Sequence, residues 1–283
     1  MTKKIAVLSA VLGMLMAAGP VMAVPGLERI STTVRPSSYR VIIPSNAIQV
    51  ADGVFSLGSA RDPQSGKMVE GYAFVRYKER EAKRGGGAAK ASVCYGYLAK
   101  GAKWKTLEPW VVNPENTRGL VSDFVLNNLS LDISKWEDAA DGVGGSYVDI
   151  LGPGSSTTDP LEADMASPDG KNEVYFADIS NSDVIAMTIV WGYFSAPIPY
   201  RQLIEWDQVY DDVTFDWSAE TAGVPGKMDF ENIATHELGH SVGMNDLYNS
   251  QCLEETMYGY AGYGEIIKRD LNKGDITGIN LLY

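Results

Sequence analysis

Apolar residues recur at helical spacing along one long segment, from Leu120 to Ala140, with polar residues between them. This pattern predicts a helix with one buried face. A second helix is predicted to begin at Asp229, whose carboxylate can cap it, and to run to about Val242. A third covers roughly Gly274 to Leu282. All the predicted helices therefore lie after Lys100.

Short apolar runs bounded by turn residues predict strands in both parts of the chain. In the first part these runs are Tyr39 to Ile43, Gly53 to Leu57 and Tyr72 to Tyr77, with a turn at Asp62 to Gly66. In the second part they are Lys105 to Val112, Tyr147 to Leu151, Glu173 to Phe176, Val184 to Phe194 and Gln202 to Tyr210. Strands together with helices predict an α+β fold.

Residues 1–23 have the pattern of a secretory signal peptide. Two lysines precede an apolar run from Ile5 to Met22, and small residues lead up to Ala23. We therefore expect cleavage after Ala23, a secreted protein, and no stable membrane association of the mature chain. The alternative is a retained membrane anchor, since the run nearly spans a bilayer before Pro20 interrupts it.

The chain of 283 residues has a net charge of −12, from 24 Lys+Arg and 36 Asp+Glu. Phosphate contacts need a basic footprint, so we expect no nucleic-acid partner. The charge is unevenly divided. Residues 24–100 carry 12 basic and 6 acidic side chains, net +6, whereas residues 101–283 carry 10 and 30, net −20. The basic, Gly-rich stretch Lys83 to Lys90 near this boundary is typical of a flexible linker.

The candidate catalytic residues lie on the helix predicted to begin at Asp229. His236 and His240 are four positions apart, so both imidazoles face one side of a helix and can bind one zinc ion. Glu237 follows the first histidine and can act as general base toward water at the metal. The chain has only these two histidines. A Ser-His-Asp or Cys-His enzyme is therefore excluded.

A third zinc ligand is expected just after this helix. Gly243 can adopt a positive φ, which lets the chain turn back toward the metal. Asp246 stands three residues later and offers a carboxylate oxygen, which leaves a fourth position open for water. Asn245 or another carboxylate is the alternative third ligand.

At these residues the chain resembles the metzincin zinc endopeptidases. The sequence from His236 to Asp246, HELGHSVGMND, is similar to their motif HExxHxxGxxH. Asp246 replaces the third histidine, as it does in snapalysin-type secreted bacterial proteases. Met257 looks like the family's methionine turn beneath the metal, and the segment from Asp270 to Tyr283 resembles the last helix of the matrixin branch.

The resemblance covers roughly Lys100 to Tyr283. It implies a metzincin-like zincin domain with a twisted, mostly parallel sheet, an antiparallel edge strand, a long helix, the zinc-site helix and a C-terminal helix. It also implies a zinc-dependent endopeptidase that hydrolyses peptide bonds with a metal-activated water. The run Val184 to Phe194 corresponds to the edge strand that binds extended peptide in this family. The matrixin cysteine-switch string PRCGxPD is absent from the sequence.

We therefore divide the chain into a signal peptide (1–23), a small β-rich extension or propeptide with a Gly-rich linker (24–90), and a metzincin-like catalytic domain (91–283). The role of the extension stays open between inhibitory, adhesive and structural. Its positive charge predicts that it docks on the acidic domain, either as an intramolecular inhibitor or as a permanent clasp.

Cys94 and Cys252 are expected to form one disulfide in an exported chain. The alternatives are two separate buried thiols, or a Cys94 thiolate that blocks the zinc. We expect one catalytic Zn²⁺, a peptide or protein substrate, and a monomer.

An acidic cluster at the end of the last predicted strand and just after it offers hard oxygen ligands for a Ca²⁺ ion; its members are Asp207, Asp211, Asp212 and Asp216. The competing function is a non-catalytic exported zinc-binding or cell-surface binding module, for which four closed protein ligands would be expected.

Overall fold

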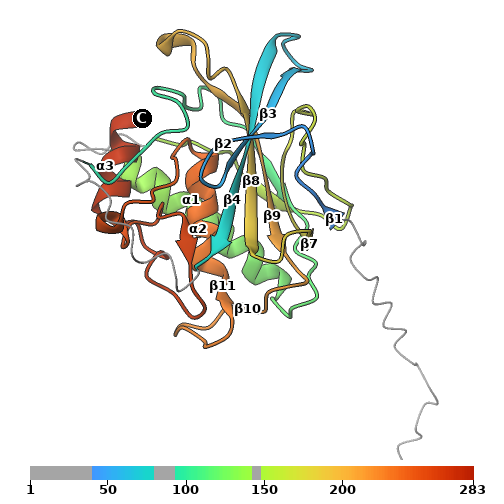
Figure 1. Ribbon diagram of the computed structural model, residues 1–283, viewed down its shortest axis with the longest axis vertical. Coiled ribbons are helices and arrows are strands. Elements are labelled where there is room, and N and C mark those ends of the chain that lie inside the picture. Colours follow the sequence, from blue (N-terminus) through green and yellow to red (C-terminus); the bar gives the residue numbers. More distant parts are fainter. Residues whose placement is uncertain (1–39, 80–92, 142–147) are drawn as a thin grey trace, which may run out of the picture. The chain divides into compact units, whose positions relative to one another are not determined.

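A computed structural model describes residues 40–79, 93–141 and 148–283 (Figure 1). The predicted signal peptide and Gly-rich linker lie outside the described residues. All the described strands and helices fall within one compact unit, Arg35–Tyr283. Within the described parts of the chain, no helix is long and apolar enough to cross a membrane.

The α-helices of the described residues are α1 (Ser122–Ala140), α2 (Phe230–Ser241) and α3 (Lys273–Leu282), which confirms the predicted helices. The apolar face of α1 is buried, and α1 packs against both other helices. The Asp229 carboxylate accepts a hydrogen bond from the backbone N–H of Asn232 and so caps α2, as expected.

Ten strands of the described residues form one mixed sheet in the order β2-β3-β4-β8-β9-β7-β5-β6, with β1 beside β7 and β12 beside β4. They are β1 (Arg40–Val41), β2 (Ile48–Ala51), β3 (Val54–Arg61), β4 (Met68–Lys78), β5 (Trp110–Val112), β6 (Gly154–Ser156), β7 (Asn172–Ile179), β8 (Val184–Gly192), β9 (Leu203–Asp211) and β12 (Tyr260–Ala261). A separate pair consists of β10 (Trp217–Ser218) and β11 (Met228–Asp229).

The two halves of the large sheet differ in direction. Each neighbouring pair in the order β6-β5-β7-β9 is parallel, whereas each neighbouring pair in the order β9-β8-β4-β3-β2 is antiparallel. The three helices lie on one side of this sheet, where α2 packs against β8 and β9 and α3 packs against α1 (Figure 1). The expected α+β architecture is confirmed.

One predicted strand, Tyr147 to Leu151, is wrong, since residues 148–151 form no strand. The backbone N–H groups of Ile150 and Leu151 donate to the Glu137 carboxylate on α1. A side chain therefore satisfies backbone donors that a sheet ladder would otherwise use. The predicted strand Lys105 to Val112 is shortened to β5.

The predicted N-terminal extension contributes strands to the sheet of the catalytic part. Strand β4 pairs with β3 on one side and with β8 on the other, so β8 is antiparallel as expected but is not an edge strand. Val75 and Phe74 lie in the hydrophobic cores on the two opposite faces of the sheet. Burial on both faces is typical of a central strand, so the expected boundary near residue 90 does not separate two compact units.

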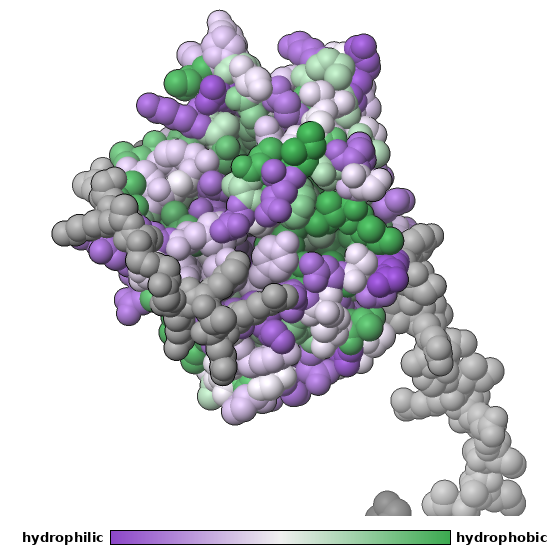
Figure 2. All heavy atoms as spheres, viewed as in Figure 1, coloured by the Kyte–Doolittle hydropathy of each residue, from purple (hydrophilic) through white to green (hydrophobic). Residues whose placement is uncertain are grey.

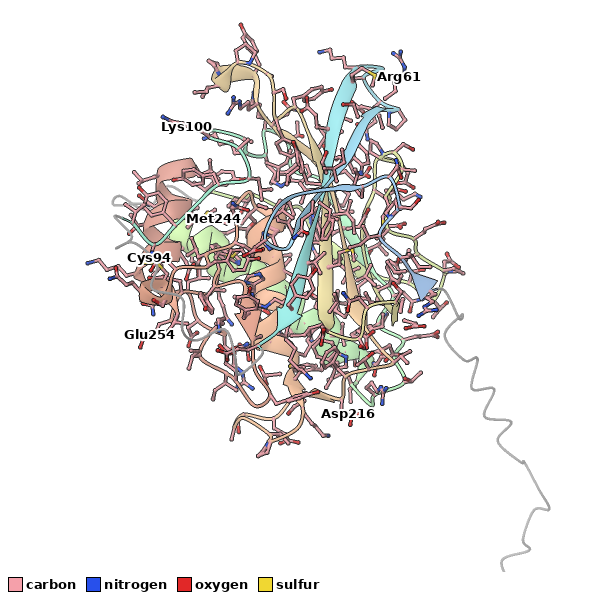
Figure 3. The ribbon with its side chains drawn as sticks, in the orientation of Figure 1. Arg61, Cys94, Lys100, Asp216, Met244 and Glu254 are labelled. Atoms are coloured by element: carbon pink, nitrogen blue, oxygen red, sulfur yellow. A yellow bond between two sulfur atoms is a disulfide. The ribbon has the colours of Figure 1, made fainter. Side chains whose placement is uncertain are left out.

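The first part of the chain is exposed at the β3–β4 hairpin and along the segment that joins β1 to β2. Arg61 lies at the outer tip of the β3–β4 hairpin (Figure 3). Ile42 and Ile48 are exposed near the segment that joins β1 to β2, and Figure 2 shows hydrophobic atoms there. This segment therefore covers the sheet without hiding all its own apolar side chains.

Candidate metal centre

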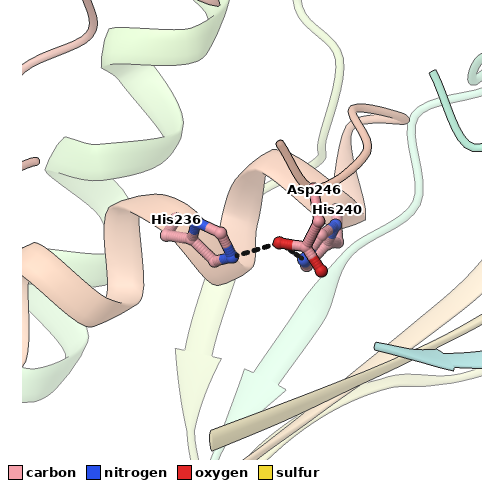
Figure 4. A group of neighbouring side chains, drawn as sticks. All are labelled: His236, His240 and Asp246. Carbon is pink, nitrogen blue, oxygen red and sulfur yellow. Dashed lines mark ion pairs between the residues drawn. The ribbon is translucent and has the colours of Figure 1, made fainter. Parts of the chain in front are cut away.

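Helix α2 and the turn after it bring the predicted zinc ligands together (Figure 4). His236 and His240 lie on one face of the helix. Gly243 has a φ of +106°, which redirects the chain so that Asp246 returns to that face. Asp246 Oδ1 lies 3.1 Å from His236 Nε2 and 3.6 Å from His240 Nε2.

These spacings fit a metal ion. Ligand atoms about 2.0–2.2 Å from a tetrahedral zinc stand about 3.4 Å apart. His236 Nε2 and Asp246 Oδ1 are buried and have no hydrogen-bond partner, and a cation between them would satisfy both. Two imidazole nitrogens and one carboxylate oxygen form the donor set of a catalytic zinc site with an open position.

Backbone carbonyls orient both imidazoles for this role. His236 Nδ1 lies 2.7 Å from the Thr256 carbonyl oxygen, and His240 Nδ1 lies 3.0 Å from that of Met244. A carbonyl only accepts, so His240 Nδ1 donates and its Nε2 keeps its lone pair for a metal. The Thr256 carbonyl favours the same tautomer of His236, although the Arg76 guanidinium, which only donates, also contacts that Nδ1.

Glu237 is fully buried beside these ligands. The Thr188 hydroxyl, from β8, donates a hydrogen bond of 2.5 Å to Glu237 Oε2, while Oε1 has no partner. One carboxylate oxygen is therefore fixed and the other is free. Burial raises the pKa of Glu237 above its usual range.

The charges of the ligands are set mainly by burial and by one another. Burial, assisted by the positive charge of Arg76, lowers the pKa of His236 to about 3, so this imidazole is neutral. Burial favours the neutral form of the Asp246 carboxyl as well, but the two imidazoles outweigh it and lower its pKa. A neutral imidazole and an ionised carboxylate are the forms that bind metals.

Met257 lies directly against α2, as the resemblance implied. A Cβ at Gly239, between the two histidines, would collide with Met257 Sδ. The Asp275 carboxylate of α3 accepts hydrogen bonds from the backbone N–H groups of Thr256 (2.6 Å) and Met257 (3.2 Å). This turn is therefore held between the zinc-site helix and the last helix.

Two residues at the site have no motif and were missed from the sequence. The guanidinium of Arg76 is buried, contacts His236 Nδ1 and donates a 2.7 Å hydrogen bond to the Tyr258 carbonyl. The Phe74 ring stacks on His240, with ring centroids 4.5 Å apart. The one available signal was a charged Arg76 within an apolar strand.

The predicted acidic cluster is divided in the structure. Asp207 lies with Asp164 and Glu205 in a group of three carboxylates. One oxygen of each lies within 4.8 Å of the other two. The other three accept hydrogen bonds from separate partners: Asp211 from Thr214, Asp212 from Thr117, and Asp216 from Arg118. Asp207 is therefore the one member of the predicted cluster that belongs to a group able to bind a cation.

Cys94 and Cys252 form a disulfide with Cα atoms 5.4 Å apart, which confirms the predicted pairing. Both alternatives, separate thiols and a Cys94 thiolate on zinc, are wrong. Figure 3 shows Cys94 on the side of the molecule where α3 lies. The disulfide ties the start of the predicted catalytic domain to the loop between Asp246 and Met257.

A zinc-site helix, a turn that returns a carboxylate, and a methionine beneath the helix define the metzincin class. Residues 155–283 match the family model described as matrixin. This match supports a matrixin-like metzincin domain over residues 155–283, and matrixins are zinc metallopeptidases. The match includes α2, Asp246, Met257 and α3, and begins after β5 and α1. No curated protein matches the sequence.

Proposed function

We propose that this chain is a secreted zinc-dependent endopeptidase, in which His236, His240 and Asp246 hold the zinc and Glu237 is the general base. The observation that best supports this is the free Oε1 of Glu237 beside a donor set with one open position. A group able to take a proton thus lies next to a group able to hold a metal.

A zinc ion bound there supplies Lewis-acid polarisation of the scissile carbonyl and of a water molecule. Glu237 Oε1 accepts the proton of the attacking water and passes it to the leaving amine. The Thr188 hydroxyl holds Oε2, so the proton-carrying oxygen has a fixed position.

The rival, a structural zinc module, is less well supported. A structural site closes zinc with four protein ligands, whereas the metal-binding group found here among the described residues has three. A structural site would also have no use for a buried carboxylate with an unpartnered oxygen next to the first ligand.

Secretion, and with it removal of residues 1–23, is part of the proposal. It rests on the signal-peptide pattern and on the Cys94–Cys252 disulfide, since disulfides persist in oxidising compartments. We propose a monomer acting on peptide or protein substrates.

We also propose a Ca²⁺ ion at Asp164, Glu205 and Asp207. Glu205 and Asp207 are buried, and Glu205 Oε1 has no hydrogen-bond partner. Three carboxylates at this spacing repel one another unless they share protons or a cation. Their hard oxygen ligands suit calcium.

The catalytic proposal is tested by zinc content and by hydrolysis of a peptide library. Glu237→Gln should retain one zinc per chain and lose at least about 100-fold in kcat, the scale of general-base catalysis. Glu231→Gln, on the same helix but partly exposed, should change neither. Arg76 contacts His236, one of the proposed zinc ligands. The Glu237→Gln comparison is therefore repeated in chains that carry Arg76→Ala, in which this contact is removed. Full activity of Glu237→Gln would contradict the proposal.

A further inference from the structure

An extended peptide binds a sheet by adding a strand to an unpaired edge. The strand nearest the proposed general base is β8, since Thr188 donates to Glu237. In this structure β4 takes the outer edge of β8, and residues Glu70–Tyr77 pair antiparallel with Gly192–Val184. The edge that a substrate peptide would use is therefore filled by the chain itself.

The opposite side of this end of β4 is paired as well. Strand β12 follows the turn that contains Met257 and runs parallel to β4, with Tyr260 opposite Tyr77 and Ala261 opposite Lys78. The backbone N–H of Glu79 donates to the Ala261 carbonyl at 2.8 Å. Near the metal centre, β4 thus lies between β8 and β12 as an inserted strand.

The segment that carries β4 also reaches all three proposed zinc ligands. Arg76 contacts His236, and Phe74 stacks on His240. Before β4, the turn at Gly53 lies beside the third ligand, because a Cβ placed on Gly53 would come within 3.6 Å of Asp246 Oδ2.

The ligands are correspondingly closed to solvent. Their side chains are 0%, 2% and 3% exposed for His236, His240 and Asp246. Carbonyl groups near β12 compensate the buried charge of Arg76, which donates to Tyr258 and Tyr260.

We propose that β4 is a built-in occupant of the peptide groove that keeps the protease latent, and that substrate binds only after β4 leaves the edge of β8. The proposal rests on the proposed endopeptidase function, since a structural zinc module has no substrate to exclude. The rival interpretation is a permanent β4 whose Arg76 takes part in catalysis.

The two interpretations predict opposite effects of Arg76→Ala and Phe74→Ala in the full mature chain loaded with zinc. A latent enzyme should gain at least about tenfold in kcat/KM on a fluorogenic peptide. Val69→Ala is the matched control, because Val69 is equally buried in β4 but pairs with Ala60, away from the ligands, and it should show no such gain. Unchanged or lower activity of Arg76→Ala at full zinc content would overturn the proposal.

A second measurement does not depend on the folding of these variants. The full chain is given one specific protease site between residues 83 and 90 and is cut there. If β4 can be withdrawn, peptide hydrolysis should rise after cutting, and backbone amides of β8 should exchange with deuterium faster than before. A cut chain with unchanged β8 protection and unchanged hydrolysis would show that β4 is permanent.

Failure of this proposal and failure of the catalytic function give different results. Suppose that intact, cut and Arg76→Ala chains hydrolyse peptide equally and that this hydrolysis depends on Glu237. The endopeptidase function would then be supported, and the proposed latency would be wrong. Absence of hydrolysis in every zinc-loaded form would remove the endopeptidase, and the latency that rests on it.

Discussion

Arg76 of β4 and His236 of α2, 160 positions apart, are in direct contact inside the protein. The contact joins the basic first part of the chain to the acidic part that carries the candidate metal ligands. Charge alone predicted a docked extension. In the structure this part of the chain contributes strand β4, which pairs with β8 in the sheet and carries the buried Arg76.

Asp246→Ala should remove most of the bound zinc, because Asp246 offers the third ligand atom of the proposed zinc site. We expect a loss of at least about 100-fold in zinc affinity, since outer contacts of metal ligands alone are worth about 10–100-fold. Asn245→Ala is the neighbouring control and should retain full zinc. Zinc titration of the two variants decides the matter, and a larger loss for Asn245→Ala would mean that the third ligand is misassigned.

Thr188→Val should lower kcat by about tenfold at unchanged zinc content, because Glu237 loses the hydrogen bond that fixes Oε2. Thr188→Ser retains a hydroxyl and should keep most of the activity. Steady-state kinetics of both variants provide the check. Equal rates for Thr188→Val and wild type would show that this hydrogen bond does not position the base.

Calcium should stabilise the protein more at high pH than at low pH. Burial raises the pKa of Glu205 from a usual 4.5 to about 9, and it raises the pKa of Asp164 to about 6. In the unfolded chain these carboxyl groups lose their protons at a lower pH than in the folded chain. Without calcium, the free energy of unfolding should therefore fall as the pH rises from about 4.5 to 9.

Glu205→Gln should flatten this fall, and added Ca²⁺ should raise the wild-type Tm at pH 8 by at least about 3 °C, equivalent to about 1 kcal/mol. Thermal unfolding across pH, with and without Ca²⁺, measures both effects. An unchanged pH slope in Glu205→Gln would contradict the assignment.

Loss of the Cys94–Cys252 disulfide should destabilise the fold. For the double variant to serine we expect a loss of roughly 2–5 kcal/mol in the free energy of unfolding. Urea unfolding measures the loss, and mass spectrometry of a non-reduced digest checks the linkage. Free thiols at both cysteines in that digest would show that the bond is absent.

Local sequence predicted what local spacing determines. The spacing of His236 and His240, the cap at Asp229 and the periodicity of α1 depend on neighbours a few positions away, and all three match the structure. The disulfide followed from counting two cysteines in a chain that the sequence predicts to be exported. Such features need no knowledge of strand order.

Long-range pairing was not predictable in the same way. The apolar run of β4 fits a central strand as well as a small separate sheet, and nothing local says that β8 is its partner. Arg76 and Phe74 therefore could not be placed at the metal centre. Asp211, Asp212 and Asp216 were grouped by sequence proximity, but folding gives each a different hydrogen-bond partner.

The most direct test of the central claim is peptide hydrolysis by zinc-loaded Arg76→Ala chains, with and without the second substitution Glu237→Gln. Our account predicts hydrolysis by the chain that keeps Glu237, and at least about 100-fold less by the chain that carries Glu237→Gln at equal zinc content. Equal hydrolysis by the two chains, or none by either, would contradict it.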